Sequence, residues 1–139
     1  SLAGFGFGWG KPVSFNPYNL KHPKRDMGLV AFAGPLSNLL MVILGLAILY
    51  FIKDNLIVSV VFPFIFINCS LALFNLIPIY PLDGFNVLSS LLPKEYAAQF
   101  AETARYGTYA LIILVLSGAT KIIITPFLEV VMNIIKLVL

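Results

Sequence analysis

Three long apolar stretches, separated by short polar segments, dominate the pattern of this chain. The first covers residues 28–52, the second covers residues 56–77, and the third begins at about Tyr106. A helix needs about 20 apolar residues to cross a hydrocarbon core of about 30 Å, and these stretches are near or above that length. The pattern therefore predicts an all-α integral membrane protein with about three transmembrane helices.

The segment before the first apolar stretch, residues 1–26, is rich in Gly, Pro and Asn, which excludes a regular helix there. Glycines alternate with aromatic residues from Gly4 to Gly10, and in an extended chain this alternation puts the aromatic rings on one face. Two interpretations remain open. One is an interfacial loop with an aromatic belt, and the other is a short hairpin or re-entrant segment whose free edge can pair with an extended peptide.

The last third of the chain predicts a polar loop, a short helix and a further apolar region. Residues 84–105 are mixed polar, and Pro93 opens a helix expected to end at Arg105. The third apolar stretch reaches about Ile124, and Pro126 interrupts it. Residues 106–139 are thus expected to hold a transmembrane helix and a C-terminal apolar helix, either a kinked extension or an interfacial helix. The whole chain, residues 1–139, is expected to form one membrane-embedded domain.

Composition supports a membrane location. Hydrophobic residues make up 60% of the chain and charged residues only 11%, against about 25% charged in soluble domains. The net charge of +3 is small and dispersed, so nucleic acid is excluded as a partner. Cys69 is the single cysteine, which excludes an intrachain disulfide and a thiolate metal cluster.

The distribution of charge predicts the topology. Lys21, Lys24 and Arg25 precede the first apolar stretch, whereas Lys53 and Asp54 cancel after it. The positive-inside rule places residues 1–26 on the cytoplasmic side, and two crossings return the chain to that side after residue 77. We therefore expect a multi-pass protein of the cytoplasmic membrane of a prokaryote.

Asp83 is the residue that most needs a function. It follows an uncharged apolar stretch, and a carboxylate near membrane depth costs a few kcal/mol, so such a residue is a functional candidate. Pro78 and Pro81, just before it, stop a regular helix. The residues alone leave three uses of Asp83 open: metal ligand, proton carrier, and turn or helix-cap residue. For Asn75, the alternative role is an interhelical hydrogen bond, which Asn commonly makes in membrane helices.

The string around Asp83 resembles a known signature. Asn75-Leu-Ile-Pro78-Ile-Tyr-Pro81-Leu-Asp83-Gly84 is similar to the Asn-x-x-Pro-x-x-Pro-x-Asp-Gly motif of the site-2 proteases, which are intramembrane zinc metalloproteases. Ala33-Gly34-Pro35-Leu36-Ser37-Asn38 resembles the second signature of that family, with Pro35 expected in the first turn of the membrane helix. Gly8-Trp9-Gly10-Lys11-Pro12-Val13, followed by Asn16-Pro17, is similar to the family's upstream hairpin. The three strings occur in the family order.

This resemblance implies a zinc metalloendopeptidase that cleaves membrane-embedded peptide segments. The topology predicted from charge places its active site on the cytoplasmic side. The resemblance implies that Asp83 is the third zinc ligand and that Asn75 positions or polarises the scissile carbonyl. The implied partners are membrane lipid and the helix of a membrane-protein substrate, whose unwound strand would pair with the hairpin. The residues that the resemblance assigns to substrate binding are Gly10, Lys11, Pro12 and Val13. Those that it assigns to the structural motifs are Gly34, Pro35, Asn38, Pro78, Pro81 and Gly84.

One family element is absent from the sequence. The family's His-Glu-x-x-His helix supplies two zinc ligands and the general base, and no such string occurs here. His22 is the only histidine, and it lies in a basic loop before the first apolar stretch. Catalytic zinc needs three protein ligands, so the zinc site is incomplete in this chain. We expect the chain to be the C-terminal part of a longer enzyme and to be inactive alone; a naturally inactive relative is the alternative.

Two hypotheses from other functional classes fit the same residues. In a proton- or cation-coupled transporter fragment, Asp83 would carry the ion, since broken helices with an intramembrane acid suit transport. A matching second broken segment, which transporter repeats normally show, is not visible. In a non-catalytic membrane scaffold, Asp83 would be only a turn residue.

Overall fold

A computed structural model describes residues 21–139, and every regular element in that range is a helix. The elements are α1 (Pro23–Phe51), α2 (Asn55–Asn75), α3 (Asp83–Leu91), α4 (Lys94–Glu102), α5 (Ala104–Leu116) and α6 (Ala119–Val138). The all-α prediction is confirmed. The predicted hairpin and its residues Gly10 to Val13 lie outside the described residues.

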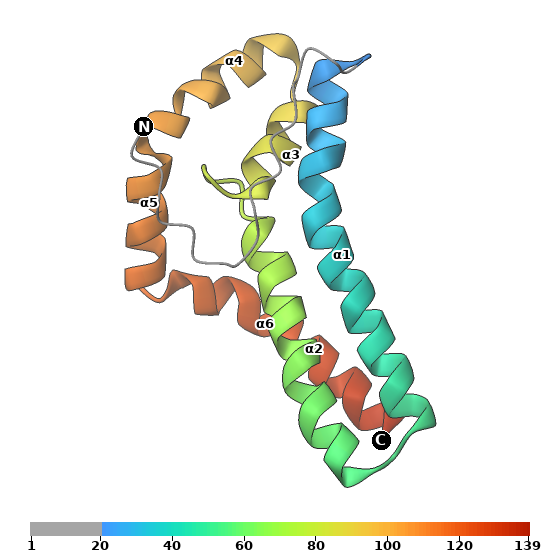
Figure 1. Cartoon of the computed structure of the whole chain (residues 1–139). Helices are drawn as coiled ribbons and strands as arrows, with labels where there is room; N and C mark the ends of the chain where they lie inside the picture. Colours follow the sequence, from blue (N-terminus) through green and yellow to red (C-terminus); the bar gives the residue numbers. More distant parts are fainter. Residues whose placement is uncertain (1–20) are drawn as a thin grey trace, which may run out of the picture.

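Helices α1 and α2 form a long antiparallel hairpin (Figure 1). Asp54 ends the turn between them as an N-cap, because its carboxylate accepts hydrogen bonds from the backbone N–H groups of Leu56 (2.9 Å) and Ile57 (3.2 Å). The two helices approach closely at Gly45, where an added Cβ would lie 2.5 Å from Ile65 Cγ1. Small residues allow such contacts between membrane helices. The buried core beside this contact consists of Val42, Leu49, Ile65, Cys69 and, from α6, Ile135.

The first helix is longer than its apolar stretch. It begins at Pro23 rather than near residue 28, and Pro35 lies inside it, fully buried, instead of in the first turn. The expectation for Pro35 was therefore wrong. Proline suits the first position of a helix, because its missing N–H would have no partner there. The added turns of α1 pack against α3, a tertiary contact that hydropathy does not report.

The last apolar region breaks earlier than the sequence indicated. Helices α5 and α6 meet at a 68° bend, where Gly118 adopts the left-handed conformation with φ of 74°. Pro126, expected to interrupt the segment, lies within α6 instead. After the bend, α6 returns across the hairpin and packs against α2 and α1 (Figure 1).

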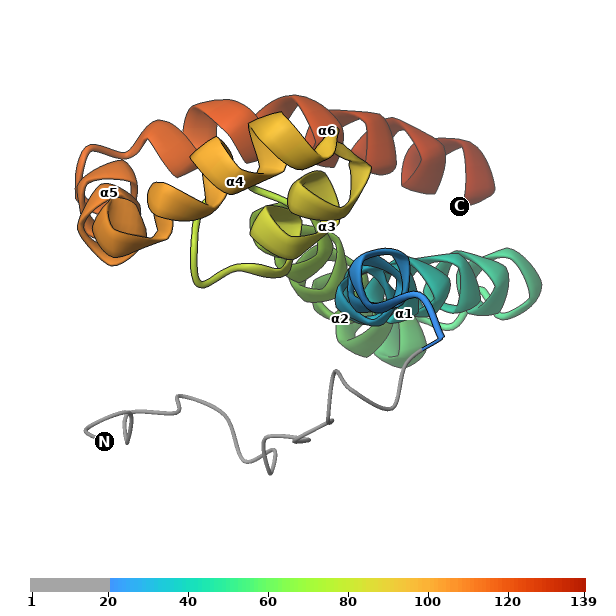
Figure 2. The same cartoon turned by 90° about the horizontal axis from the view of Figure 1, so that it is seen from above.

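Two helices, α1 and α2, are long and apolar enough to cross a membrane, and the bent pair α5–α6 would make a third span. Many of their large apolar side chains are exposed, as is typical of lipid-facing surfaces. The expectation of an all-helical membrane protein with about three spans agrees with this arrangement. The short helices α3 and α4 connect the hairpin to α5, and α3 lies between α1 and α5 in both views (Figure 1, Figure 2).

Candidate active site

The segment between α2 and α3, residues 76–82, is a compact reversal of the chain. Pro78 and Pro81 lack the backbone N–H that a continuing helix would use, and α2 ends before them at Asn75. The segment is closed by short turns, in which the N–H of Ile79 donates to the carbonyl of Ile77 (2.8 Å) and that of Leu82 to Ile79 (2.9 Å). The Tyr80–Pro81 peptide bond is cis. Helix α3 begins at Asp83, and the contact of Gly84 with Leu76 places this start beside the end of α2.

Gly84 is what allows α3 to start so close to α2. A Cβ on Gly84 would collide with the carbonyl group of Leu76 and would lie 2.5 Å from the carbonyl oxygen of Ile77. These neighbours are backbone atoms, which cannot swing aside as the end of a side chain can. Glycine is therefore the residue that fits here, and its contact holds Asp83 near the C-terminal end of α2, where Asn75 lies.

Asp83 faces the second motif across the α1–α3 contact. A Cβ on Gly34 would lie 3.0 Å from Asp83 Oδ2, so the carboxylate occupies the space that a side chain on α1 would fill. Helix α3 then runs back along α1, and Ser90, near its other end, packs directly on Gly28. The two glycines of α1 thus set the distance between α1 and α3, and Gly34 lies against the acid.

The surroundings of Asp83 do not fit a helix cap. Asp83 is the first residue of α3, the N-cap position belongs to Leu82, and no side chain makes a capping hydrogen bond at this end. The cap alternative is therefore wrong. Partial burial raises the pKa of the Asp83 carboxyl above its ordinary value, because desolvation disfavours the charged form. Among residues 21–139, no donor hydrogen-bonds this carboxylate.

The other residues of the predicted site take different positions. Asn75 is the last residue of α2 and is half-buried. Asn38 is half-buried one turn beyond Gly34 on α1, while Pro78 and Pro81 are exposed. The structure therefore places Asp83 against Gly34. Asn75 lies at the same end of α2, next to the residues that Gly84 contacts.

An aromatic cluster that was not predicted from the sequence packs against the reversal on the side of α4 and α5. The buried ring of Phe85 stacks on Phe100 of α4 with centroids 4.6 Å apart, and it meets Tyr80 edge-on at 5.8 Å. Such aromatic pairs contribute about 0.5–1.5 kcal/mol beyond their buried area. Helix α5 presses on the same segment, since a Cβ on Gly107 would lie 2.6 Å from Tyr80 Cβ. A glycine inside an apolar helix was the one available signal for this contact.

Two pockets flank the reversal. One, of about 360 Å³, lies between the end of α2 and α6 and is lined by Leu73, Leu76, Ile77, Pro78, Ile123 and Phe127. The other, of about 290 Å³, lies between the reversal and α5 and is lined by Pro78, Ile79, Tyr80, Thr103, Tyr106, Gly107 and Ala110. Pro78 thus borders open space on both sides, so the segment before Asp83 forms a thin wall.

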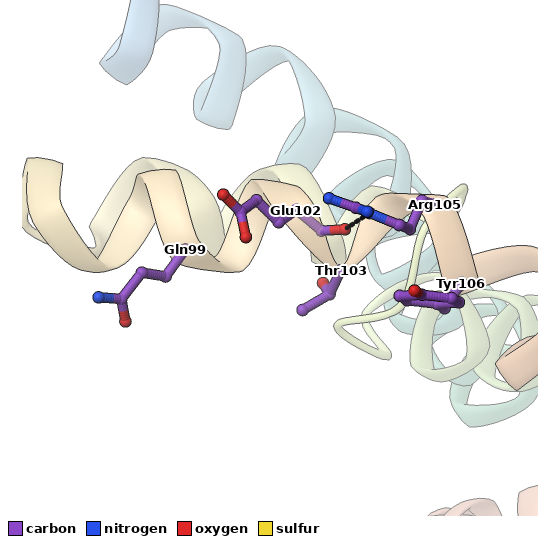
Figure 3. A pocket seen from close by; sticks show the side chains of 5 residues that line it. All are labelled: Gln99, Glu102, Thr103, Arg105 and Tyr106. Atoms are coloured by element: carbon purple, nitrogen blue, oxygen red, sulfur yellow. Dashed lines mark hydrogen bonds between the residues drawn. The ribbon is translucent and has the colours of Figure 1, made fainter.

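A third, more polar pocket of about 330 Å³ lies at the corner between α4 and α5. Figure 3 shows Arg105 in it, whose Nε donates a hydrogen bond to the carbonyl oxygen of Glu102 (3.3 Å). The Arg105 guanidinium also lies 5.7 Å from the ring centroid of Tyr106. Asp83 does not line this pocket, and its polar groups already satisfy one another in part.

The described residues do not complete a metal site. Among residues 21–139, no three His, Cys, Asp or Glu side chains are grouped so that they could hold a metal ion. His22 lines a pocket with Ser90, toward the far end of α3 from Asp83, so it is not placed to be a second ligand. Within residues 76–84, Asp83 is the one side chain of these four types.

The reversal and its surroundings match a known family. The family model of peptidase family M50 matches residues 52–116, which include α2, the reversal with Asp83, and α3 to α5. This match supports assignment of the chain to the site-2 protease family. It is 29% identical over 134 residues to the curated Bacillus subtilis (strain 168) protein "Putative zinc metalloprotease YwhC", an alignment that covers 89% of this chain. The chain spans 61% of the length of that relative. No solved structure matches this chain.

Similarity to this family agrees with the resemblance that the motifs indicated. The matched range contains Asn75, Pro78, Pro81, Asp83 and Gly84. It also contains Phe85, Phe100 and Gly107, the residues that support the reversal. Gly34, although outside the matched range, is the residue whose contact with Asp83 joins the two motifs in space.

Proposed function

We propose that this chain carries the aspartate half of an intramembrane zinc metalloprotease, with Asp83 as one zinc ligand. The observation that carries the proposal is the placement of the Asp83 carboxylate. It lies against the bare backbone of Gly34, at a break in an apolar helix, without a hydrogen-bond donor among the described residues. A partly buried acid in a membrane protein needs a partner, and a metal ion is one that the family suggests.

The described residues alone do not fit a whole zinc site, because catalytic zinc needs three protein ligands. We propose that the remaining ligands and the general base come from a His-Glu-x-x-His helix encoded outside this sequence. Bound zinc supplies such enzymes with a polarised carbonyl and a water of lowered pKa. The residues of this chain serve to hold and orient the carboxylate.

Each contact around Asp83 has a part in that orientation. Gly34 leaves room for the carboxylate on the α1 side, and Gly84 allows the first turn of α3 to rest on Leu76. The Phe85–Phe100 stack and the Tyr80–Gly107 contact hold the reversal from the α4–α5 side. A metal ligand must be held within about 0.5 Å of its productive geometry, which rigid packing on three sides provides.

Asn75 is proposed to bind the substrate. Its half-buried side chain at the end of α2 carries two N–H donors and one carbonyl acceptor. From there it would donate a hydrogen bond to the carbonyl oxygen of the bond to be cut, which is the position where negative charge develops. The segment Gly10 to Val13 is proposed to hold the substrate strand by pairing with its backbone.

The basic residues at the start of α1 support the proposed location of the site on the cytoplasmic side. Lys24 and Arg25 lie at the start of α1, and α2 returns the chain so that Asp83 lies beside Gly34 in the same half of α1. The positive-inside rule puts this end toward the cytoplasm. We therefore propose a multi-pass protein of a prokaryotic cytoplasmic membrane that acts on the helices of other membrane proteins from the cytoplasmic side.

The decisive experiment uses the complete protein expressed from its full reading frame and reconstituted in lipid. We expect stoichiometric bound zinc and cleavage of a membrane-spanning test helix, with activity lost on chelation and restored by added zinc. The same helix segment presented as a soluble peptide serves as the comparison and should be cut more slowly. A full reading frame without a His-Glu-x-x-His helix, or cleavage that resists chelators, would overturn the proposal.

A further inference from the structure

We propose that a basic pocket at the start of α1 binds the phosphate group of an anionic lipid. The pocket has a volume of about 530 Å³, within the range of small-ligand sites, and is lined by His22, Pro23, Lys24, Arg25, Ser90 and Lys94. This site lies outside the reversal that holds Asp83 and does not depend on the proposed proteolysis.

The cations of this pocket come from parts of the chain that are far apart in sequence. Lys24 and Arg25 belong to the first turn of α1, whereas Lys94 is the first residue of α4. Residues that only flank a membrane span would follow one another along the chain, as Lys24 and Arg25 do. The fold adds Lys94 to them around a shallow, open pocket.

The two sides of the pocket are tied together by a specific contact. The Nζ of Lys24 donates a hydrogen bond to the carbonyl oxygen of Leu92, the last residue before the turn into α4. On the same wall, Ser90 packs on Gly28 and donates its hydroxyl hydrogen to the carbonyl of Val87 (2.6 Å). The pocket floor is therefore built by α1 and α3, and the positions of Arg25 and Lys94 around it are set by that packing.

The balance of charge at this end favours an anion. Near this end the sequence places four cations, Lys21, Lys24, Arg25 and Lys94, and two carboxylates, Asp26 and Glu95. Asp26 Oδ2 accepts a hydrogen bond from the backbone N–H of His22 (3.2 Å), so part of its capacity is used at the helix start. Arg25 and Lys94 are exposed and supply donors suited to phosphate oxygens, Arg as a planar fork and Lys as a point charge.

A phospholipid headgroup fits the pocket better than free phosphate. The pocket lies at the end of α1, a helix that is long and apolar enough to span the membrane, so its mouth is at the level where headgroups lie. Basic pockets between membrane helices on the cytoplasmic side are sites of this kind. Free inorganic phosphate offers the same oxygens without acyl chains to contact the exposed apolar side chains of α1, such as Leu29.

The test measures thermal unfolding of the complete protein in an uncharged detergent with a thiol-reactive dye, which reports exposure of the buried Cys69. Phosphatidylglycerol, phosphatidylcholine and sodium phosphate are titrated separately at constant ionic strength. We expect phosphatidylglycerol to raise the melting temperature with saturation and phosphatidylcholine to have little effect. A full rise with sodium phosphate alone would assign the site to free phosphate; no rise with either anion would overturn the proposal.

Matched charge variants separate the pocket from general attraction. Arg25→Gln with Lys94→Gln removes two cations of the pocket, and Lys53→Gln with Lys121→Gln removes two exposed cations that do not line it. One juxtamembrane cation contributes about fivefold to binding of anionic lipid, so the pocket variant should need about 25-fold more phosphatidylglycerol for half-saturation. The control should bind as the parent does, and an equal loss in both variants would overturn the pocket. Native mass spectrometry of the parent protein gives a check that needs no variant to fold: phosphatidylglycerol should be retained in preference to phosphatidylcholine.

Discussion

The carboxylate of Asp83 lies where a side chain on Gly34 would be, since a Cβ on Gly34 would approach Asp83 Oδ2 to 3.0 Å. The two residues belong to different motifs and different helices, and the α1–α3 contact joins them. This relationship explains why a glycine is needed in the middle of an apolar helix, where it would otherwise cost about 1 kcal/mol relative to alanine.

Gly34→Ala is expected to lower activity without lowering stability. The new methyl group would press on the Asp83 carboxylate and shift it from its position, while alanine favours the helix by up to about 1 kcal/mol. Zinc content and cleavage rate of the complete protein should fall, and the melting temperature should hold or rise. Ala47→Leu, which adds a side chain on an exposed part of α1, is the control and should leave both unchanged. Full activity in Gly34→Ala would show that the contact does not orient the acid.

The substitution Asp83→Asn distinguishes a metal-binding role of Asp83 from a purely structural role. Asn keeps the size and the hydrogen-bonding shape of the side chain but loses the charge that favours zinc. Because no described residue donates a hydrogen bond to this carboxylate, its removal should not destabilise the fold. We expect both Asp83→Asn and Asp83→Ala to remain inserted and folded, to lose zinc and to be inactive. An Asn variant that cleaves a membrane substrate at the parental rate would end the ligand hypothesis.

Gly107→Ala tests the support of the reversal by α5. Its Cβ would lie 2.6 Å from both Tyr80 Cβ and the Tyr80 carbonyl oxygen, so α5 or the reversal must move. Overpacking of this kind costs about 1–3 kcal/mol, which thermal unfolding would detect. Thr108→Ala, on an exposed position of the same helix, should change stability by less than about 0.5 kcal/mol. Equal stability of the two variants would mean that α5 does not press on the segment.

Substitutions at Gly118 should change stability through backbone conformation rather than through steric contact with neighbours. Its φ of 74° is left-handed, and nothing lies within 4 Å of a Cβ built there. Gly118→Ala should therefore cost about 1–2 kcal/mol through strain alone. Gly118→Asn should cost less, because Asn tolerates this conformation better. The order Gly, Asn, Ala in melting temperature is the expected result, and an Ala variant as stable as the parent would contradict a left-handed bend.

Cysteine labelling in a Cys69→Ala background tests the topology. Cysteines placed at Lys24 and Glu95 should be labelled from one side of the membrane, and a cysteine at Lys53 from the other. The reason is that α1 crosses between Lys24 and Lys53, whereas α2 returns the chain and α3 then runs along the first half of α1. Labelling of Lys24 and Lys53 positions from the same side would rule out α1 as a complete span.

Much of the fold could be predicted from local sequence. The apolar stretches predicted α1 and α2, and the short polar segment between them predicted their separation. Pro93 predicted the start of α4, although α4 ends at Glu102 rather than at Arg105. These features depend on composition and on residues close in the chain, where hydropathy and proline geometry act directly. The Asp83 string was equally visible, because the prolines and the acid are neighbours in sequence.

The tertiary structure decided what those elements do together. Packing against α3 extended α1 back to Pro23, and the left-handed Gly118 moved the last bend away from Pro126, because a proline is tolerated in a helix when its surroundings compensate. The contacts of Gly34 with Asp83 and of Gly107 with Tyr80, like the meeting of Lys94 with Arg25, join residues distant in sequence. Periodicity reports which face of a helix is apolar, but only the packing of one helix on another determines which residue lies opposite.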